Sequence, residues 1–445
     1  MSDVVETERE SGTVARLGPR QVSIPDDWEA VPFEEAIDLN PSYDKPDEGT
    51  FDYLPMDAVD EEMQTIEYWT QREKDDCTTT WFKNGDTVYA KITPCTENGK
   101  IAFIDGLDTE VGSGSTEFLV FHPREGVTNE RFVYYLANLP EFRSVTISLM
   151  EGSTGRQRVP SDVFSGGLEV PLPPLPEQRR IADILSTVDE QIQRTEEIIE
   201  ETEELKQGLL QNLLRHGMGK SSIEERRIGP KEFTFPKNWR IEQVADLLSD
   251  ETEGKPLRGG PPGGKIHKED RSEGGYKLYT QEVVTKRDID FGGEYITEDL
   301  FEELKSAEPK SGDILITRAG TVGEAIVFPE GAARGIIDSA LMRLRLDKSI
   351  CDPRFIALLI DESRVVKDQI EAMTQSGVVR NLNNRIIKQL QIPIPPKEEQ
   401  ERIISIISTT NEKREKERQT KQAYQELKRG LMQDLLTGKV RVNTE

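Results

Sequence analysis

The chain of 445 residues repeats itself once, and this internal repeat constrains its fold more than any other feature. Residues 169–181 (EVPLPPLPEQRRI) align with residues 391–403 (QIPIPPKEEQERI), with identity at seven of the 13 positions. Further matches follow the same order in both halves: Trp28 and Trp239, Gly85-Asp86 and Gly312-Asp313, Arg131-Phe132 and Arg354-Phe355, LLQNLL (209–214) and LMQDLL (431–436). We therefore predict two copies of one unit, each a globular part followed by a long helix.

The spacing of the matched residues differs most in one region. Trp28 and Gly85 are 57 residues apart, whereas Trp239 and Gly312 are 73 residues apart. From the glycine-arginine loops that precede the proline segments onward, the offset is constant at 222 residues. The halves therefore share a frame and diverge in the early globular part.

Short apolar stretches predict the elements of each globular part. Residues 87–92 and 313–318 alternate or run apolar with β-branched residues and favour strands, and residues 117–121 and 340–346 follow a similar pattern. The apolar stretches after Arg131-Phe132 and Arg354-Phe355 favour helices. The proline clusters at 171–174 and 393–396 predict extended segments. The expected fold class is α+β.

A long helix is predicted after each proline cluster. Its apolar residues recur at steps of three and four, as in a coiled coil, and Gly217 and Gly438 follow as stop signals. At 1.5 Å per residue, such a helix would be roughly 58 Å long. Antiparallel pairing of the two helices with each other is the simplest arrangement, and pairing of each helix with another protein is the alternative.

Composition argues against several classes of protein. No stretch is long and apolar enough for a membrane span, and the acidic N-terminus lacks the order of a secretory signal. The three cysteines form no CxxC pair, and the three histidines lack metal-ligand spacing. We expect reduced thiols, no metal site, a cytoplasmic location and a disordered tail at the N-terminus.

The formal net charge of −26 is unevenly distributed along the chain. Residues 1–220 carry 20 basic and 44 acidic residues, whereas residues 221–445 carry 37 and 39. Either the protein does not bind nucleic acid, or it works in a high-salt cytoplasm, where charges are screened within about 3 Å at 1 M salt. Composition leaves both explanations open.

Catalytic motifs are missing, whereas basic and polar loops recur. No nucleotide-binding, metalloprotease, hydrolase, adenine-methyltransferase or helicase motif is found, which argues against an enzyme. Loops at 91–100, 152–158, 257–268 and 380–385 carry Arg, Lys, Asn and Gln, the residue types that contact base edges. Their occurrence in both halves favours DNA contact, although a solvated surface loop explains each one separately.

The combined pattern resembles the specificity subunit of Type I restriction-modification enzymes over about residues 23–440. The resemblance rests on two globular parts, each followed by PxPPxxEQxxI and a long helix ending in an LLxxLL-like run. Further marks are FDYLPMDAV (51–59), FKNGDTVYAKITPCTENGKIAF (82–103), GSTEFLVF (114–121), SGDILITRAGTVGEAIVF (311–328) and NLNNRIIKQLQIPIPP (381–396).

The resemblance implies a fold with two target-recognition domains separated by two long helices that pair as an antiparallel coiled coil. The expected boundaries are a disordered acidic tail over 1–22, the first recognition domain over 23–176, a spacer helix over 177–217, a linker over 218–232, the second recognition domain over 233–397, a spacer helix over 398–438 and a tail over 439–445.

The resemblance also implies a function without catalysis. Each domain would recognise one half of a split double-stranded DNA target, and the helices would set the gap between the halves. Two modification subunits would dock on the helices and methylate adenine with S-adenosylmethionine, and restriction subunits would add cleavage driven by ATP with Mg. This subunit would bind no cofactor and no membrane.

Candidate site residues follow from the loops and from the proline-helix segments. The expected DNA-binding residues are Lys91, Thr93, Lys100, Ser115, Thr116, Arg156, Arg158, Arg258, Lys265, His267, Lys268, Gln281, Arg318, Ser339, Arg380 and Asn381. The expected interface with the helices and modification subunits comprises Pro173, Pro174, Glu177, Gln178, Ile181, Pro395, Pro396, Glu399, Gln400 and Ile403. The main alternative is an acidic coiled-coil scaffold or DNA mimic that binds proteins and not DNA.

Overall fold

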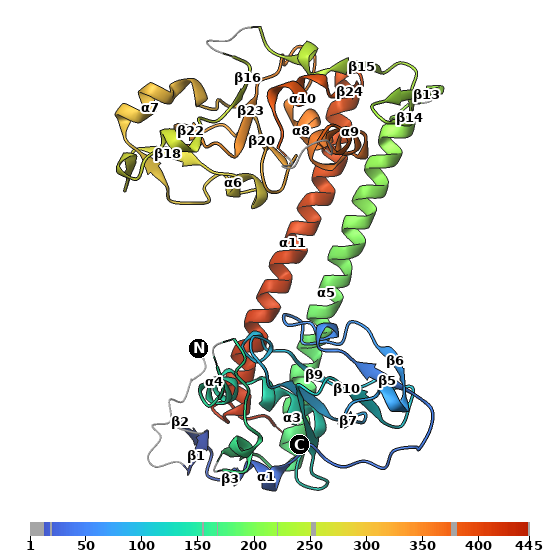
Figure 1. Ribbon diagram of the computed structural model, residues 1–445, viewed down its shortest axis with the longest axis vertical. Coiled ribbons are helices and arrows are strands. Elements are labelled where there is room, and N and C mark those ends of the chain that lie inside the picture. The colour runs from blue at the N-terminus through green and yellow to red at the C-terminus, as the bar shows by residue number, and fades with distance from the viewer. Residues whose placement is uncertain are drawn as a thin grey trace, which may run out of the picture. The chain divides into compact units, whose positions relative to one another are not determined.

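The computed structural model describes residues 13–17, 20–153, 155–166, 168–219, 221–250, 255–374 and 381–443. The chain forms two compact units, unit 1 with Met1–Glu197 and Glu417–Glu445, and unit 2 with Ile198–Lys416. Two long helices, α5 (Leu175–His216) and α11 (Lys397–Leu436), each contribute one part to each unit (Figure 1).

Unit 1 contains two four-stranded sheets, ordered β6-β5-β10-β7 and β4-β11-β8-β9. Helix α3 packs against β8, β9 and β11. The strands are β1 (Thr13–Leu17), β2 (Arg20–Ile24), β3 (Glu29–Pro32), β4 (Ile37–Leu39), β5 (Thr50–Leu54), β6 (Thr70–Glu73), β7 (Thr80–Phe82), β8 (Thr87–Ala90), β9 (Ile101–Phe103), β10 (Gly112–Gly114), β11 (Phe118–Pro123) and β12 (Glu169–Leu172). The helices are α1 (Phe33–Ala36), α2 (Cys95–Asn98), α3 (Glu130–Asn138) and α4 (Pro140–Ser148), with 3-10 turns at Met56–Ala58, Lys74–Asp76 and Ser161–Phe164.

Unit 2 also contains two four-stranded sheets, ordered β16-β23-β20-β21 and β17-β19-β18-β22. The strands are β13 (Ile223–Ile228), β14 (Lys231–Pro236), β15 (Arg240–Gln243), β16 (Leu257–Gly259), β17 (Arg271–Ser272), β18 (Tyr276–Tyr279), β19 (Tyr295–Ile296), β20 (Ile314–Thr317), β21 (Ala325–Val327), β22 (Gly335–Ile337), β23 (Leu341–Leu344) and β24 (Gln391–Ile394). The helices are α6 (Glu282–Thr285), α7 (Glu298–Leu304), α8 (Pro353–Glu362), α9 (Arg364–Thr374) and α10 (Asn384–Gln389), with 3-10 turns at Val244–Leu247, Gly263–Lys265, Lys268–Asp270 and Lys305–Ala307.

The repeat seen in the sequence is also a repeat in strand pairing. The order β4-β11-β8-β9 in unit 1 corresponds to β16-β23-β20-β21 in unit 2, and the parallel pair β5-β10 corresponds to β18-β22. In each unit the strand after the tryptophan pairs with the proline strand, β3 with β12 and β15 with β24. The predicted α+β class is confirmed, and the predicted strands at 87–92 and 313–318 correspond to β8 and β20.

Within each unit the long helices run antiparallel, as predicted. In unit 1, Glu196 pairs with Lys421 and Asp189 pairs with Lys428, so positions rise along α5 as they fall along α11. In unit 2, Glu203 pairs with Arg414, and Leu210, which follows along α5, shares a core with Ile407, which precedes along α11. The apolar stripes that predicted the coiled coil join the cores of the globular parts, since Leu185 belongs to the core of unit 1 and Leu210 to that of unit 2.

A left-handed glycine follows each long helix, as predicted. Gly217 has φ 66° and Gly438 has φ 68°, a conformation that side chains with Cβ rarely adopt. A Cβ at Gly217 would press on Pro236, and a Cβ at Gly438 would press on Pro25 and Trp28. Each helix end therefore packs on the tryptophan turn of the unit in which it ends.

Three segments predicted as tails or linker take part in the fold. Of the tail predicted to be disordered over 1–22, residues 1–12, 18 and 19 lie outside the described residues, and the described part contributes to a hairpin of β1 and β2 in which Ala15 and Ile24 are buried. The linker over 218–232 contains the hairpin of β13 and β14, which buries Ile228. Both hairpins precede a tryptophan turn and belong to the repeat. In the C-terminal tail, Arg441 forms ion pairs with Asp27 and Glu177 of unit 1.

The long helices also differ slightly from their predicted bounds of 177–217 and 398–438. Helix α5 begins at Leu175, because a proline at position 176 fits the first turn, where no amide partner is required. Helix α11 begins at Lys397 and ends at Leu436.

Candidate nucleic-acid interface

One backbone junction occurs in both units and brings together most of the predicted DNA-binding residues. In unit 1 the Lys91 amide, directly after β8, donates to the Glu117 carbonyl (2.9 Å), and the Lys91 carbonyl accepts from the Val159 amide (2.8 Å). We call this region, residues 91–93, 115–117 and 156–159, junction 1. It joins the end of a buried strand, the turn before β11 and a returning loop.

Unit 2 repeats this hydrogen-bond pattern. The Arg318 amide, directly after β20, donates to the Ala340 carbonyl (2.9 Å), and the Arg318 carbonyl accepts from the Leu382 amide (3.0 Å). We call residues 318–320, 338–340 and 381–382 junction 2. The pattern makes Lys91 equivalent to Arg318, as in the sequence alignment of the two Gly-Asp strands.

Junction 1 presents a guanidinium that is held in place. Arg158 donates from Nε to Glu117 Oε2 (2.9 Å) and from Nη2 to Glu117 Oε1 (2.6 Å). The hydrogen bond from Arg158 lowers the pKa of Glu117. A fork held at two donors has little freedom to turn, so the remaining donors of Arg158 point in a defined direction. Thr116 is exposed beside this pair.

Two more predicted residues complete junction 1. The Thr93 amide donates to the Gln157 carbonyl (3.0 Å), which places the loop with the exposed Arg156 beside the end of β8. Ser115 shapes the turn, because its amide donates to the Leu54 carbonyl (3.0 Å) and its hydroxyl accepts from the Glu117 amide (3.3 Å).

Junction 2 has the same frame with different side chains. Ser339 and Asn381 are exposed at the positions that Thr116 and Arg158 occupy in unit 1. Arg318 extends over β16, where a Cβ at Gly259 would lie 2.7 Å from its Nη1 atom. A side chain at position 259 would have to displace the end of Arg318. Gln281 lies near Gly320, since a Cβ there would be 3.4 Å from Gln281 Oε1.

The structure does not bring every predicted residue to a junction. Lys100 donates from Nζ to the carbonyls of Met56 (3.1 Å) and Val59 (2.8 Å), so it braces a loop. Lys265 and His267 are exposed in the segment after β16. Arg258 lies within β16, opposite Arg343 of β23. Lys268 belongs to a 3-10 turn. Arg380 lies outside the described residues.

Sequence reasoning missed two acidic residues of these turns. Glu117 orients Arg158, and Asp338 accepts from the Ala340 amide (2.9 Å) in the turn of junction 2. Burial raises the pKa of Asp338 to about 6. Serine and aspartate both form such turns through a side-chain oxygen and an amide two residues on, which makes Ser115 and Asp338 equivalent. This shared preference for turns was the sequence signal that could have identified Asp338.

The predicted interface residues form a joint between helix and globular part in each unit. Trp28 Nε1 donates to Glu177 Oε2 (3.1 Å), and Trp239 Nε1 donates to Glu399 Oε2 (3.1 Å). The Glu177 carboxylate also accepts a hydrogen bond from Arg441. The two tryptophans found in the sequence repeat thus bind the helix start of their own unit.

The glutamines that follow repeat a second set of bonds. Gln178 donates to the Pro173 carbonyl (2.9 Å) and accepts from the Asn129 amide (2.8 Å). Gln400 donates to the Pro395 carbonyl (2.8 Å) and accepts from the Asp352 amide (2.8 Å).

Most of the predicted interface residues are used inside their own unit. The buried ones are Pro173, Glu177, Gln178, Ile181, Pro395, Gln400 and Ile403. Pro174 and Pro396 are exposed, and Glu399 is half-buried. Only these three retain surface for a partner.

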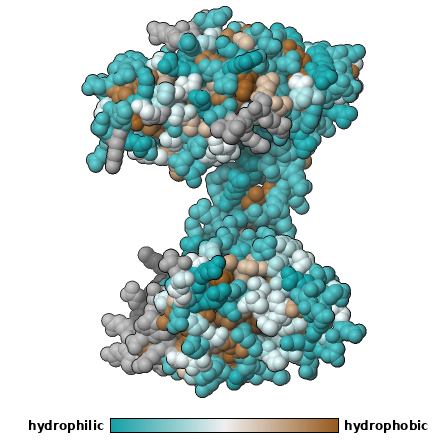
Figure 2. Space-filling view, in the orientation of Figure 1, coloured by the Kyte–Doolittle hydropathy of each residue, from teal (hydrophilic) through white to brown (hydrophobic). Residues whose placement is uncertain are grey.

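The face of the molecule shown in Figure 2 is predominantly hydrophilic, with scattered apolar residues. Within the described ranges, no group of three or more His, Cys, Asp or Glu residues is placed to hold a metal ion. Among the helices described, none combines the length and apolar character that a membrane crossing requires.

Comparison with known proteins connects this geometry to a family. The family model described as "Type I restriction modification DNA specificity domain" matches residues 25–204 and 262–425, one match in each half of the chain.

Two relatives illustrate the range of similarity. The chain is 32% identical over 236 residues to the Type I restriction enzyme EcoAI specificity subunit of Escherichia coli, a match that covers 51% of this chain and only 37% of that protein. It is 24% identical over 446 residues to the Type I restriction enzyme MjaVIII specificity subunit of Methanocaldococcus jannaschii, which covers 94% of both proteins.

A solved structure shares the fold. It comes from work on complex assembly and conformational transition of the type I R-M system, with a TM-score of 0.55 and 19% identity over 94% of this chain and 100% of that chain. Since the family model matches most of the chain in two copies, the chain belongs to the family of type I restriction-modification DNA specificity domains.

Proposed function

We propose that this chain recognises a bipartite double-stranded DNA target and has no catalytic role, with junction 1 contacting one half-site and junction 2 the other. One observation carries the proposal: the two junctions share a backbone frame but carry different side chains. Lys91, Thr116 and Arg158 in unit 1 stand where Arg318, Ser339 and Asn381 stand in unit 2. A common frame with exchanged donors suits two readers of different base sequences.

The proposal includes partners that act on the recognised DNA. The family relationship supports two modification subunits that dock on the long helices and use S-adenosylmethionine to methylate adenine in each half-site. Restriction subunits would add cleavage with ATP and Mg, in the cytoplasm. The exposed Pro174 and Pro396 and the half-buried Glu399 are the candidate contacts beside the helix starts. The helices would set the number of unspecified bases between the half-sites.

The high negative charge fits this function in a saline cytoplasm. At high ionic strength the repulsion between the acidic surface and DNA phosphates is screened, whereas direct contacts at the junctions persist. An acidic scaffold or DNA mimic would instead bind proteins and leave DNA unmethylated.

Mapping of methylated adenines tests the proposal. The chain is co-expressed with its neighbouring modification subunit, and methylated positions are found by sequencing. We expect a bipartite motif, with Arg158→Ala altering one half and Asn381→Ala altering the other. Lys305→Ala, in the exposed first position of the 3-10 turn that follows α7, is the matched control and should leave both halves unchanged. A stable, active complex without bipartite methylation would contradict the proposal.

A further inference from the structure

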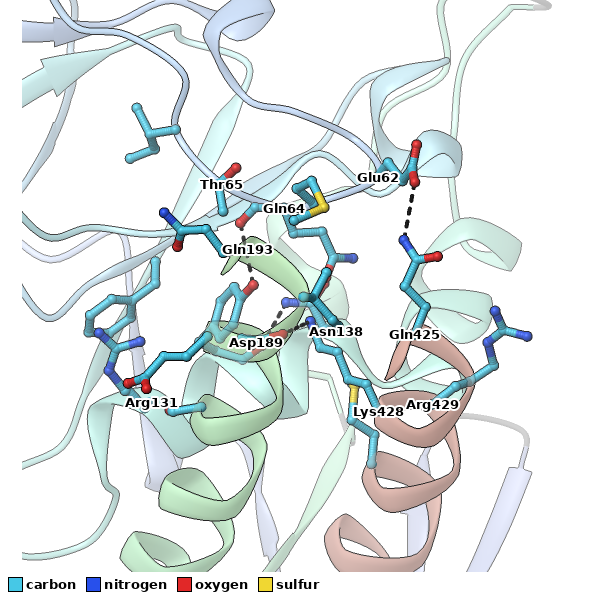
Figure 3. Close-up of a pocket in the computed structure, with 18 of the residues that line it drawn as sticks. Glu62, Gln64, Thr65, Arg131, Asn138, Asp189, Gln193, Gln425, Lys428 and Arg429 are labelled. Atoms are coloured by element: carbon cyan, nitrogen blue, oxygen red, sulfur yellow. Dashed lines mark hydrogen bonds and ion pairs between the residues drawn. The ribbon is translucent and has the colours of Figure 1, made fainter. Parts of the chain in front are cut away.

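Among the described residues, three ion pairs connect the long helices with the acid on α5 and the base on α11. In unit 1, Asp189 pairs with Lys428 (2.7 Å) and Glu196 pairs with Lys421 (2.7 Å). In unit 2, Glu203 pairs with Arg414. We call these three pairs the charge ladder. Figure 3 shows its first pair, Asp189 and Lys428, at the wall of a cavity of about 830 Å³ in unit 1.

The charge ladder follows a single antiparallel register. The acids are seven residues apart along α5, and the bases are seven residues apart along α11 in the opposite direction. The same register places Ala182 opposite Leu435 and Leu210 opposite Ile407, one apolar pair on each side of the ladder. These four side chains are buried in the cores of their units. A spacing of seven is the repeat at which charged positions on paired helices face each other.

The bases are more buried than the acids. The side chains of Lys428, Lys421 and Arg414 are 13%, 15% and 15% exposed, whereas the acids are 31% to 38% exposed. A buried cation that loses its carboxylate is left without compensation, and breaking such a pair is strongly destabilising. The ladder therefore penalises any alignment that removes the acid from a base.

Each pair also has a third member. Tyr135 of α3 donates to Asp189 (2.7 Å), and Glu62 approaches Lys421 (3.0 Å) from the globular part of unit 1. Lys206 contacts Glu203 (3.2 Å) and Glu362 of α8 (3.0 Å) in unit 2. The ladder thus ties the globular part of each unit to both helices.

Slipped alignments are disfavoured for two reasons. A shift by a step that is not a multiple of seven residues takes all three pairs out of register, and a shift by fourteen keeps one pair at most. A shift by seven keeps two pairs but places Glu203 opposite the buried Ile407 and Lys428 opposite Ala182. The charge ladder therefore disfavours shifts that separate its ion pairs. The apolar pairs at its ends disfavour the shift by seven.

Pairing of either helix with a second copy of itself is also disfavoured. Antiparallel pairing of two α5 helices about Glu196 would place Asp189 opposite Glu203, carboxylate against carboxylate. Pairing of two α11 helices would place Lys428 opposite Arg414. Like charges at facing positions are destabilising, so the ladder favours the pairing of α5 with α11.

We propose that the charge ladder is a register lock, which holds α5 and α11 in one alignment and thereby fixes the spacing of the two half-sites. The consequence for DNA rests on the proposed function, whereas the lock on the helices does not. The ladder residues act as positioning residues. They set the alignment of the helices that carry junctions 1 and 2, and they contact no base themselves.

Spin labels measure the register without DNA. Labels at Arg194→Cys and Ala423→Cys, both exposed in unit 1, are introduced with Cys77→Ser and Cys95→Ser, and their separation is measured by double electron–electron resonance. We expect one narrow distance for the parent chain. Lys421→Glu should broaden it and add a population displaced by up to about 10 Å, the rise of seven helical residues.

Two further variants separate register from stability. The charge swap Glu196→Lys with Lys421→Glu should restore the single distance. Arg418→Glu makes the same charge change at an exposed position of α11 and should leave the distance unchanged. A lower melting temperature for Lys421→Glu with an unchanged narrow distance would overturn the lock.

Methylation mapping tests the consequence for DNA. With the modification subunit, the parent chain should methylate targets of one spacer length, and Lys421→Glu should methylate targets of more than one length or lose methylation. The charge swap should return a single length. If the parent shows no bipartite methylation while the spin-label results hold, the proposed function fails and the lock stands. Unchanged spacer length and unchanged distances in Lys421→Glu would refute the lock.

Discussion

Trp28 and Glu177 lie 149 residues apart in the sequence, and the indole Nε1 of one donates to the carboxylate of the other at 3.1 Å. Trp239 and Glu399 repeat the bond with the same length in unit 2. The tryptophan turn that opens each globular part thus binds the first turn of the helix that follows it. The orientation of each long helix is set at this joint.

Loss of the indole donor should weaken this joint. Trp28→Phe keeps an aromatic ring but removes the indole donor. Oε2 of the buried Glu177 then accepts from Arg441 and no longer from residue 28. We expect the free energy of unfolding to fall by about 1–2 kcal/mol, the cost of an unmade buried hydrogen bond. Calorimetry of Trp28→Phe and Trp239→Phe measures this, and transitions identical to those of the parent chain would contradict the role of the bond.

The orienting role of Glu117 can be tested through specificity. Glu117→Gln removes the ionic acceptor that holds Arg158 at two donors. We expect relaxed specificity at one position of one half-site, because a mobile guanidinium discriminates less well than a held one. Arg158→Ala should relax the same position and cost about 1–3 kcal/mol of binding. Relaxation in the other half-site would show that junction 1 is wrongly assigned.

Salt dependence tests the proposed saline cytoplasm. With a net charge of −26, the chain should bind its target poorly at low salt and retain binding near 1 M salt, where the screening length is about 3 Å. Fluorescence anisotropy of the complete complex with labelled duplex DNA measures this. Binding confined to salt below about 0.1 M would refute adaptation to high salt.

The pH dependence of stability should reveal Asp338. Burial raises its pKa from 3.8 to about 6, so the folded state favours the protonated carboxyl. This stabilisation is present below about pH 4 and is lost as the pH rises through 6. Asp338→Asn preserves an acceptor for the Ala340 amide and removes the penalty. We expect the variant to melt at the same temperature as the parent chain at pH 4 and at a higher temperature above pH 6. The gain in the free energy of unfolding above pH 6 should be at most about 3 kcal/mol.

Melting curves of both proteins between pH 4 and pH 8 provide the measurement. A constant difference in melting temperature across this range would show that Asp338 is not the group responsible. Asp290→Asn, at an exposed site, is the control and should show no such trend.

The sequence predicted the elements that have strong local patterns. The apolar run after Arg131-Phe132 became α3, and the heptad spacing predicted the long helices and their antiparallel pairing. The hairpin of β13 and β14 was missed because charged residues occupy both faces of β13 and only Ile228 is buried. Without an apolar alternation, such a strand gives no periodic signal.

The candidate site was less predictable because tertiary contacts decide which polar residues remain available. Lys100 lies in a basic loop, yet its ammonium group donates hydrogen bonds to carbonyls that are distant in sequence. Glu177 and Gln178 recur in both repeats, and recurrence alone does not distinguish a partner surface from an internal joint. The equivalence of Lys91 and Arg318 was visible, since the Gly-Asp turns align the two strands.

Arg441 and Asp27 form an ion pair although 414 residues separate them. Unit 2 is one continuous stretch of chain, whereas unit 1 combines residues from both ends of the sequence. During synthesis the ribosome delivers every residue of unit 2 before the part of α11 that belongs to unit 1. The first recognition domain to be translated is therefore the last to be completed, and until Arg441 emerges the buried Glu177 lacks its cationic partner.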